Sequence, residues 1–281
     1  MGTLYDVHQH LWPPPLIEAL RKRDTPPRLR GDVVELPSGA WRVDLAAHDP
    51  ETRLALLDEH GVDVAVVSCP PTLELDERLL DAYHDGITEV VGASKGRFLA
   101  FSSDAALDGF AGVCVSAPTL IDLVRAEPLL SELERRRGLL FVHPGPDAIV
   151  AGLPDWWPAV VGYTAQMQAA YASWVTSGAT RWPELRVVFA ILAGGAPMQL
   201  ERLASRGVDT RAILHENVFL DTASYGERAL SLALATYGVG QLVYGSDTPV
   251  IDCGGTLRAV RGFGQAVADS VCSATPTRLM T

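Results

Sequence analysis

The residues best suited to bind a metal ion lie near the start of the chain, in the stretch Asp6-Val7-His8-Gln9-His10. Side chains two residues apart on a strand point the same way, so we expect His8 and His10 to face one point. Two neutral imidazoles at such a point can bind one zinc ion at about 2.0–2.1 Å. Asp6 is expected to orient one ring by accepting its second N–H. On its own, the spacing also fits a pair of hydrogen-bonded surface histidines.

Two later motifs offer further ligands, each at the end of an apolar run. His143 follows Phe141-Val142, and Asp247 lies in Gly245-Ser246-Asp247-Thr248-Pro249. Alone, His143 could be structural and Asp247 could cap a turn. If the runs end at one face of the fold, however, three histidines and an aspartate converge there, and few structural roles require such a group.

The elements that would bring these residues together are short apolar runs that alternate with helical patterns. Eight such runs are present: Leu4–His8, Val62–Ser68, Arg97–Ser102, Phe110–Ser116, Leu139–His143, Val187–Leu192, Val218–Asp221 and Leu242–Ser246. Continuous apolar runs are typical of parallel strands buried on both faces, and the alternation indicates βα units. In 281 residues this predicts one domain over 1–281, a (β/α)8 TIM barrel whose strand ends meet at one face.

Three parts of the chain depart from a regular barrel. Residues 102–110 are too few for a full crossover helix. We therefore expect one outer helix to be missing or shortened between the third and fourth strands, with a neighbouring segment or another subunit covering the gap. A homo-oligomer is one of these two alternatives. Pro13–Leu45, rich in Pro and charge, and Gly145–Tyr163, with two adjacent Trp, are expected to be lids.

Composition excludes several classes of partner. The chain has 23 basic and 34 acidic residues and no cluster of Lys and Arg, so a nucleic acid is not expected to bind. No apolar run is long enough to cross a bilayer, and no secretory signal is visible at the start. The four cysteines form no CxxC pair and are expected to be buried and reduced. A cytoplasmic enzyme with a small-molecule substrate is the simplest interpretation.

The motifs together resemble the amidohydrolase superfamily, and within it the amidohydrolase-related group that includes aminocarboxymuconate-semialdehyde decarboxylase. The resemblance covers nearly the whole chain in order, through Asp6–His10, Phe141–Pro144, Trp157-Pro158, Arg186–Arg202 with its paired Gly194-Gly195, and Gly245–Pro249. It implies a mononuclear site for one divalent ion, with His8, His10, His143 and Asp247 as ligands. Members with two metals bridged by a carbamylated lysine are excluded, because the only lysines are Lys22 and Lys95.

The chain departs from that pattern at one chemically important position. The group carries a histidine two residues before the paired glycines, where it helps to activate metal-bound water. Here that position is Leu192, whose side chain can neither take a proton nor form a hydrogen bond. Loss of a general base typically costs about 10²–10⁴-fold in rate. Either Asp247 acts as the base, another residue substitutes, or hydrolysis has been lost.

Candidate substrate contacts come from arginine and tryptophan residues near the motifs. Arg42 and Arg202 could bind a substrate carboxylate through two hydrogen bonds, or could form surface ion pairs. Trp12, Trp156 and Trp157 could line a pocket for a flat apolar substrate, or could be core residues under the loops.

Three functions fit these observations. The first is a metal-dependent hydrolase of an amide, ester or lactone bond, in which a zinc ion supplies hydroxide and Asp247 takes the proton. The second is a metal-dependent non-oxidative decarboxylase or another lyase or cyclase, favoured by the resemblance to the decarboxylase group and by Leu192. The third is a non-catalytic binding protein on the same barrel. The sequence ranks them in this order.

Overall fold

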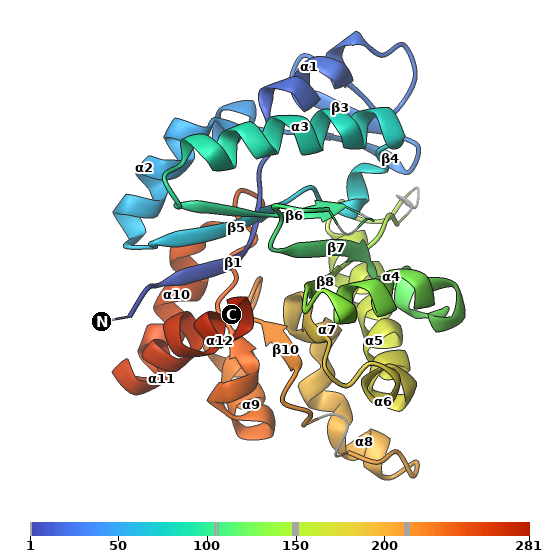
Figure 1. Ribbon diagram of the computed structural model, residues 1–281, viewed down its shortest axis with the longest axis vertical. Coiled ribbons are helices and arrows are strands. Elements are labelled where there is room, and N and C mark those ends of the chain that lie inside the picture. The colour runs from blue at the N-terminus through green and yellow to red at the C-terminus, as the bar shows by residue number, and fades with distance from the viewer. Residues whose placement is uncertain (1, 104, 106, 148–151, 211–213) are drawn as a thin grey trace.

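Eight parallel strands form the centre of the protein. The computed structural model describes residues 2–103, 105, 107–147, 152–210 and 214–281. The strands are β1 (Tyr5–His10), β5 (Val64–Ser68), β6 (Phe98–Ser103), β7 (Gly112–Ser116), β8 (Leu139–His143), β9 (Arg186–Phe189), β10 (Val218–Asp221) and β11 (Leu242–Val243). They follow one another around a nearly closed barrel in chain order (Figure 1). The predicted (β/α)8 TIM barrel is confirmed.

The barrel closes between its last strand and its first through separate hydrogen bonds. The Val7 amide donates to the Tyr244 carbonyl at 2.9 Å, and the Asp247 amide donates to the His8 carbonyl at 2.8 Å. A further bridge joins Gln9 and Thr248. The predicted last strand, Leu242–Ser246, is therefore too long: β11 ends at Val243, and the residues after it run beside β1.

Two other strand ends that bear on the site differ from the prediction. The first strand extends to His10 instead of ending at His8. The strand predicted to run to Leu192 ends at Phe189, because Ile191 and Leu192 have φ values of 47° and 48°, in the left-handed region that no strand uses.

Helices cover the outside of the barrel and follow most of the strands. They are α1 (Pro14–Lys22), α2 (Pro50–His60), α3 (Glu77–Ala93), α4 (Leu123–Arg135), α5 (Tyr163–Ser173), α6 (Ala179–Arg181), α7 (Ile191–Gly195), α8 (Leu200–Ala204), α9 (Glu227–Tyr237), α10 (Cys253–Gly262), α11 (Gln265–Asp269) and α12 (Thr275–Met280). Helix α2 begins and ends where its capping residues predict. Asp49 accepts a hydrogen bond from the Thr52 amide at 2.8 Å, and Gly61 ends the helix at φ 67°.

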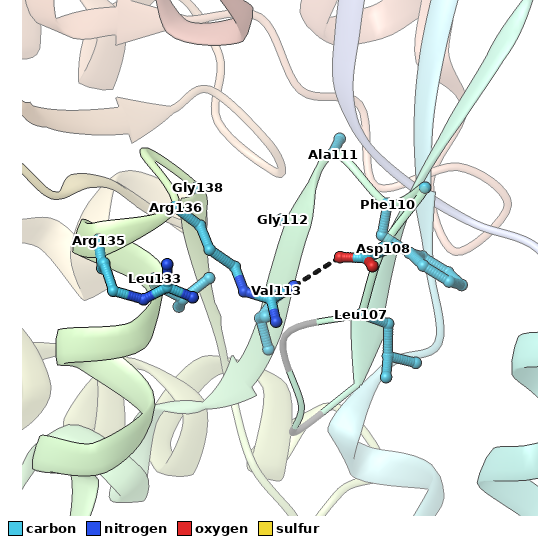
Figure 2. Close-up of a pocket in the computed structure, with 11 residues that line it drawn as sticks. Leu107, Asp108, Phe110, Ala111, Gly112, Val113, Leu133, Arg135, Arg136 and Gly138 are labelled. Atoms are coloured by element: carbon cyan, nitrogen blue, oxygen red, sulfur yellow. Dashed lines mark hydrogen bonds and ion pairs between the residues drawn. The ribbon is translucent and has the colours of Figure 1, made fainter.

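Among the described residues between β6 and β7 there is no helix, as expected. A cavity of about 530 Å³ opens there, bordered by residues 107–113 and by Leu133, Arg135, Arg136 and Gly138 (Figure 2). Arg136 and Asp108 form an ion pair of 2.7 Å across it. Because Gly112 begins β7 and Gly138 precedes β8, this cavity lies at the end of the barrel opposite the carboxyl ends of the strands.

The two predicted lids differ in how far the structure describes them. Pro13–Leu45 is not a bare loop: it contains α1 and an antiparallel sheet of β2 (Arg28–Arg30), β3 (Val33–Leu36) and β4 (Gly39–Arg42). Of the second, Gly145–Tyr163, residues 148–151 lie outside the described residues. A covering role for either segment stays a prediction.

The barrel interior is filled by aromatic rings beneath the predicted ligands. Phe101 and Phe141 stack in parallel at 5.1 Å, and Phe141 meets the edge of the His8 ring at 5.0 Å. All four cysteines are buried and free of disulfides, as expected. In the described part of the chain, no helix combines the length and the apolar character needed to cross a membrane.

Candidate metal centre

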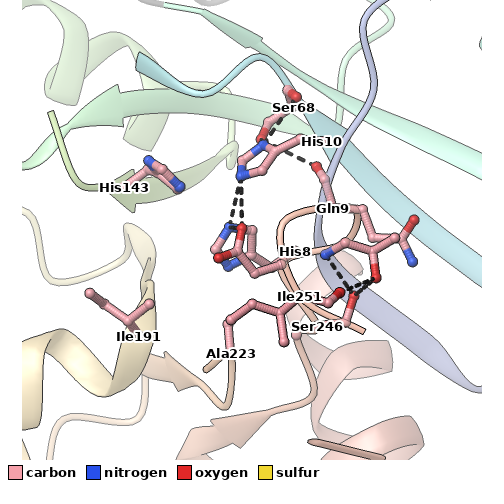
Figure 3. A network of polar contacts seen from close by, with 12 residues as sticks. His8, Gln9, His10, Ser68, His143, Ile191, Ala223, Ser246 and Ile251 are labelled. Carbon is pink, nitrogen blue, oxygen red and sulfur yellow. Dashed lines mark hydrogen bonds and ion pairs between the residues drawn. The ribbon is translucent and has the colours of Figure 1, made fainter. Parts of the chain in front are cut away.

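The four predicted ligands meet at the carboxyl end of the barrel. His8 and His10 come from β1, His143 ends β8, and Asp247 follows β11; each offers one ligand atom, and these atoms lie within 4.8 Å of one another. The Nε2 atoms of His8 and His10 are 3.2 Å apart. An oxygen of Asp247 lies 3.1 Å from Nε2 of His10 and 3.4 Å from Nε2 of His8. In Figure 3 the rings of His8, His10 and His143 face one another.

These separations fit a bound cation. Ligand atoms about 2.0–2.1 Å from a tetrahedral metal ion lie about 3.3 Å from one another. The measured 3.1–3.4 Å matches that spacing for the three atoms of His8, His10 and Asp247. The residues present therefore suit one divalent ion.

The second ring nitrogen of each histidine supports the same conclusion. Nδ1 of His8 lies 2.6 Å from a carboxylate oxygen of Asp221. Nδ1 of His10 lies 3.1 Å from the Ser68 hydroxyl and 3.3 Å from the Ser68 carbonyl, and Nδ1 of His143 lies 2.9 Å from the Pro144 carbonyl. A carboxylate or carbonyl partner requires a proton on Nδ1, so in a neutral ring Nε2 carries the lone pair. Two neutral rings would direct the Nε2 lone pairs of His8 and His10 at each other, an arrangement that needs a cation or a proton between them.

Asp221 was missed by the sequence analysis, which assigned the ring-orienting role to Asp6. That assignment is wrong, because β1 contains a bulge: from Asp6 to Gln9 it advances three residues while β5 advances two, from Ala65 to Val67. Asp6 instead accepts hydrogen bonds from the backbone amides of His8 at 3.2 Å and Ser246 at 3.0 Å. Asp221 could have been proposed as a site residue, because it is a carboxylate at the carboxyl end of a predicted strand.

Burial and neighbouring carboxylates set the protonation of the ligands. Burial lowers the pKa of His8, but Asp221 and Asp247 outweigh it and raise that pKa to about 9. Burial lowers the pKa of His10 and holds that of His143 well below its ordinary value. Burial raises the pKa of Asp247, but His8 and His10 outweigh it, so the net shift is downward. At neutral pH the metal-free site holds a carboxylate, two neutral histidines and a protonated His8, whose proton a cation would displace.

The turn after β9 supplies no proton acceptor to this site. Residues 191–195 all have positive φ, and the amide of Ile191 donates to Asp221 at 2.8 Å, which ties the turn to the partner of His8. Ile191 and Leu192 are both aliphatic and buried. Whichever of them corresponds to the usual histidine, neither can take a proton. Asp247 also has a positive φ, 66°, a strained conformation that often marks functional residues.

The structure does not bring every predicted substrate contact to the ligands. Arg42 pairs with Asp32 at 2.7 Å with 80% of its side chain exposed, and Arg202 is exposed on α8. Within the described residues neither forms a hydrogen bond or ion pair with a ligand. Trp12, two residues beyond His10, is buried against His48, while Trp156 is exposed and Trp157 half-buried, with their rings 5.9 Å apart.

Comparison with known proteins agrees with the site. A protein-family model described as Amidohydrolase matches residues 5–279. The chain belongs to this amidohydrolase family. A 2-amino-3-carboxymuconate-6-semialdehyde decarboxylase of Dictyostelium discoideum is 24% identical over 256 residues, which cover 76% of this chain and 68% of that protein.

Solved structures share the fold of this amidohydrolase. The 5-carboxyvanillate decarboxylase of Sphingomonas paucimobilis superposes with a TM-score of 0.79 at 18% identity, over 100% of this chain and 99% of that one. A dihydroxybenzoic acid decarboxylase of Polaromonas sp., solved with manganese and the inhibitor 2-nitroresorcinol, has a TM-score of 0.68 at 14% identity, over 100% and 97%.

These relatives overturn the first-ranked function. From the sequence we expected hydrolysis first and decarboxylation second, but the named relative and both proteins of the solved structures above are decarboxylases. The expectation of a hydrolase was wrong because water activation was carried over from the superfamily despite the missing histidine. The chain is an enzyme of the amidohydrolase superfamily with a His/Asp metal-binding group.

Proposed function

We propose that this protein is a metal-dependent non-oxidative decarboxylase of a small aromatic or unsaturated carboxylic acid. The observation that carries the proposal is a complete ligand set beside a turn in which Ile191 and Leu192 are aliphatic. Decarboxylation converts R–COO⁻ and a proton to R–H and CO2, so it consumes no water and needs no group to activate water. The decarboxylases among the similar proteins support the same reaction class.

We propose one divalent ion, held by His8, His10, His143 and Asp247. Zinc remains our expectation for its identity, and manganese is the alternative because a similar structure carries it. Nitrogen and carboxylate ligands suit both metals. When bound, such an ion supplies positive charge that orients and polarises substrate oxygens.

The side chains of the site would perform the remaining tasks. Asp247 is proposed to hold the proton that replaces the lost carboxylate, since its side chain is 13% exposed whereas those of His8 and His10 are 0% and 3% exposed. Trp12, Trp156 and Trp157 are proposed to contact the flat part of the substrate. Arg42 and Arg202 remain candidates for binding a further carboxylate of the substrate. Their side chains would have to change conformation to contact it.

The test is CO2 release from a panel of aromatic and unsaturated acids by protein loaded with zinc or with manganese. We expect at least one acid to lose CO2, with activity abolished by chelation and restored by the metal. In D2O the product should carry deuterium at the carbon that lost the carboxylate, because the incoming proton comes from solvent.

Two variants sharpen this experiment. His143→Ala removes a ligand and should abolish CO2 release, while Arg202→Ala, on an exposed helix, tests one candidate for substrate binding through KM. CO2 release that persists after complete chelation would refute the proposal. So would a reaction product that has gained oxygen from solvent water instead of hydrogen.

A further inference from the structure

A buried arginine lies behind the metal ligands without a carboxylate beside it. Arg53, on α2, is 1% exposed. Its guanidinium donates to the side-chain oxygen of Gln9 at 3.0 Å, to the carbonyl of His10 at 3.1 Å and to the carbonyl of Ala47 at 2.6 Å. Among the described residues no Asp or Glu lies within ion-pair distance of it. A buried cation is costly unless its charge is compensated, so the compensating charge must act through another group.

The carboxylate of Asp6 is the group that can compensate Arg53, and the amide of Gln9 connects the two. Burial raises the pKa of Asp6, while the hydrogen bonds that it accepts from Gln9, Ser246 and His8 act in the opposite direction and favour the carboxylate. Asp6 is 0% exposed and accepts a hydrogen bond from Nε2 of Gln9 at 2.8 Å. The Gln9 oxygen accepts from Arg53 while its nitrogen donates to Asp6, so only one orientation of the amide satisfies both neighbours. The three side chains form a row of cation, dipole and anion, in which each hydrogen bond has a charged partner and is correspondingly strong.

The bulge in β1 makes this row possible. Residues three apart on a regular strand point to opposite faces, so Asp6 and Gln9 could not normally meet. The extra residue between them in β1 puts both on the side away from the ligand rings. In Figure 3 the side chain of Gln9 points away from the rings of His8 and His10.

The two ends of the row contact the backbone of two ligands and of the residue before a third. Asp6 accepts hydrogen bonds from the amide of His8 and from that of Ser246, the residue before Asp247. Arg53 donates to the carbonyl of His10. Displacing either end would therefore move the chain that carries His8 and His10 relative to the segment that carries Asp247.

We propose that the buried charges of Arg53 and Asp6 compensate each other through the Gln9 amide between them, and that this row positions His8, His10 and Asp247 for metal binding. Arg53, Asp6 and Gln9 are positioning residues, because none of them reaches the metal position. The inference rests on the proposed metal site and is independent of the reaction catalysed there.

The test is a double-mutant cycle on metal affinity, measured by calorimetry on metal-free protein titrated with Zn²⁺. Arg53→Met and Asp6→Asn should each weaken binding about 10–100-fold, the range typical for groups that support metal ligands. The double variant should lose less than the product of the two single effects, because neither uncompensated charge remains. If the fold-losses in Zn²⁺ affinity of the two single variants simply multiply in the double variant, Arg53 and Asp6 do not compensate each other, and the inference is refuted.

A matched control separates positioning from general destabilisation. Arg186 is half-buried and also donates to backbone carbonyls, those of Leu279 and Arg137, near the start of β9. Arg186→Met should lower the thermal midpoint but leave the Zn²⁺ affinity and the visible spectrum of the Co²⁺-loaded protein unchanged. Arg53→Met should alter both the affinity and the spectrum.

The outcomes distinguish this inference from the proposed metal site. If the wild type binds no metal, the site itself is refuted and the inference falls with it. If the wild type binds Zn²⁺ and Arg53→Met binds it equally well, only the inference is refuted. Should Arg53→Met fail to fold, Arg53→Lys keeps the charge but loses the fork of donors, and it should still weaken binding and shift the Co²⁺ spectrum; an unchanged spectrum would refute the inference.

Discussion

The partner of each ligand histidine decides whether that histidine can bind a metal. For His8 this partner is Asp221, which contacts Nδ1 with one oxygen and accepts the amides of Ile191 and Ala223 with the other. Both oxygens are thus used, and both are buried. The carboxylate fixes the tautomer of the ring and also connects β10 to the turn after β9.

Replacing Asp221 with Asn should therefore weaken metal binding with little change of shape. The Asn oxygen can keep the two backbone amides, which leaves its NH2 group facing Nδ1 of His8. The ring must then accept at Nδ1 and carry its proton on Nε2, where it cannot bind a cation. We expect Zn²⁺ affinity to fall about 10–100-fold by calorimetry.

Asp122→Asn provides the matched control for that variant. Asp122 caps α4 on the surface, where Asn caps equally well, so affinity should stay at the wild-type value. Equal affinity in Asp221→Asn and the wild type would contradict the tautomer argument.

At the scale of single residues, the sequence predicts the candidate metal ligands better than the residues that contact them. His8, His10, His143 and Asp247 could be predicted because each lies at or just after the end of a recognisable apolar run, and the structure brings them together. The pairing of each ring with its partner could not, because Ser68, Pro144 and Asp221 come from three different strand ends whose register is set by the closed barrel. The pairing of Arg53 with Asp6 depends on a bulge, which leaves no mark in the residue pattern.

At the scale of elements, the segment between β1 and α2 is anchored by a ring stack. The short helix η1 (Leu45–His48) ends in His48, which stacks on Trp12 at 4.6 Å and accepts the Trp12 amide at Nδ1 at 3.1 Å. Burial, followed by the charges of Arg53 and His10, lowers the pKa of His48 to about 3. The stack therefore requires a neutral ring.

This anchor should make the fold sensitive to acid. His48 has an ordinary pKa of about 6.5 when unfolded, so between pH 6.5 and 3 the unfolded state binds more protons than the folded state. The contribution of His48 is complete above pH 6.5 and is lost as the pH falls, at about 1.4 kcal/mol per pH unit. The free energy of unfolding, measured with urea at pH 7 and pH 5, should fall by about 2 kcal/mol from this group.

His48→Asn isolates that effect, because Asn can accept the Trp12 amide but does not titrate. The variant should be less stable than the wild type at pH 7, since the ring stack is lost, yet it should lose about 2 kcal/mol less on going to pH 5. Parallel pH dependences in the two proteins would exclude His48 as the acid-sensitive group.

Elements with strong length or capping signals could be predicted, and those made by tertiary pairing could not. The missing helix between β6 and β7 follows from the few residues available, and α2 follows from Asp49, Pro50 and Gly61. The small sheet β2–β3–β4 inside the predicted lid Pro13–Leu45 could not be predicted, because strands of three or four residues are too short to show a period. The end of β9 was misplaced because a local left-handed turn overrides apolar character. The end of β11 was misplaced because the residues after Val243 run beside β1 through separate hydrogen bonds.

At the scale of the molecule, one bound ion would connect distant parts of the chain. His8 and His10 lie in the first strand, His143 in the fifth, and Asp247 after the last, where the barrel closes through single hydrogen bonds instead of a regular ladder. A metal that binds only the folded state stabilises it by mass action, by about 2.7 kcal/mol at a concentration 100 times Kd. The closure between β11 and β1 should gain most from this.

We therefore expect the thermal midpoint of the metal-free protein to rise by about 5–10 °C when it is saturated with Zn²⁺ or Mn²⁺, measured by calorimetric scans. His143→Ala keeps β1 and the closing hydrogen bonds but lacks one ligand, so its midpoint should respond much less to the metal. The cluster His60, Asp252 and Cys253 could also attract a cation, so Cys253→Ser serves as the control and should keep the full rise. A rise of the same size in His143→Ala and the wild type would mean that the stabilising ion binds elsewhere. Metal binding at the four ligands would then not stabilise the closure of the barrel.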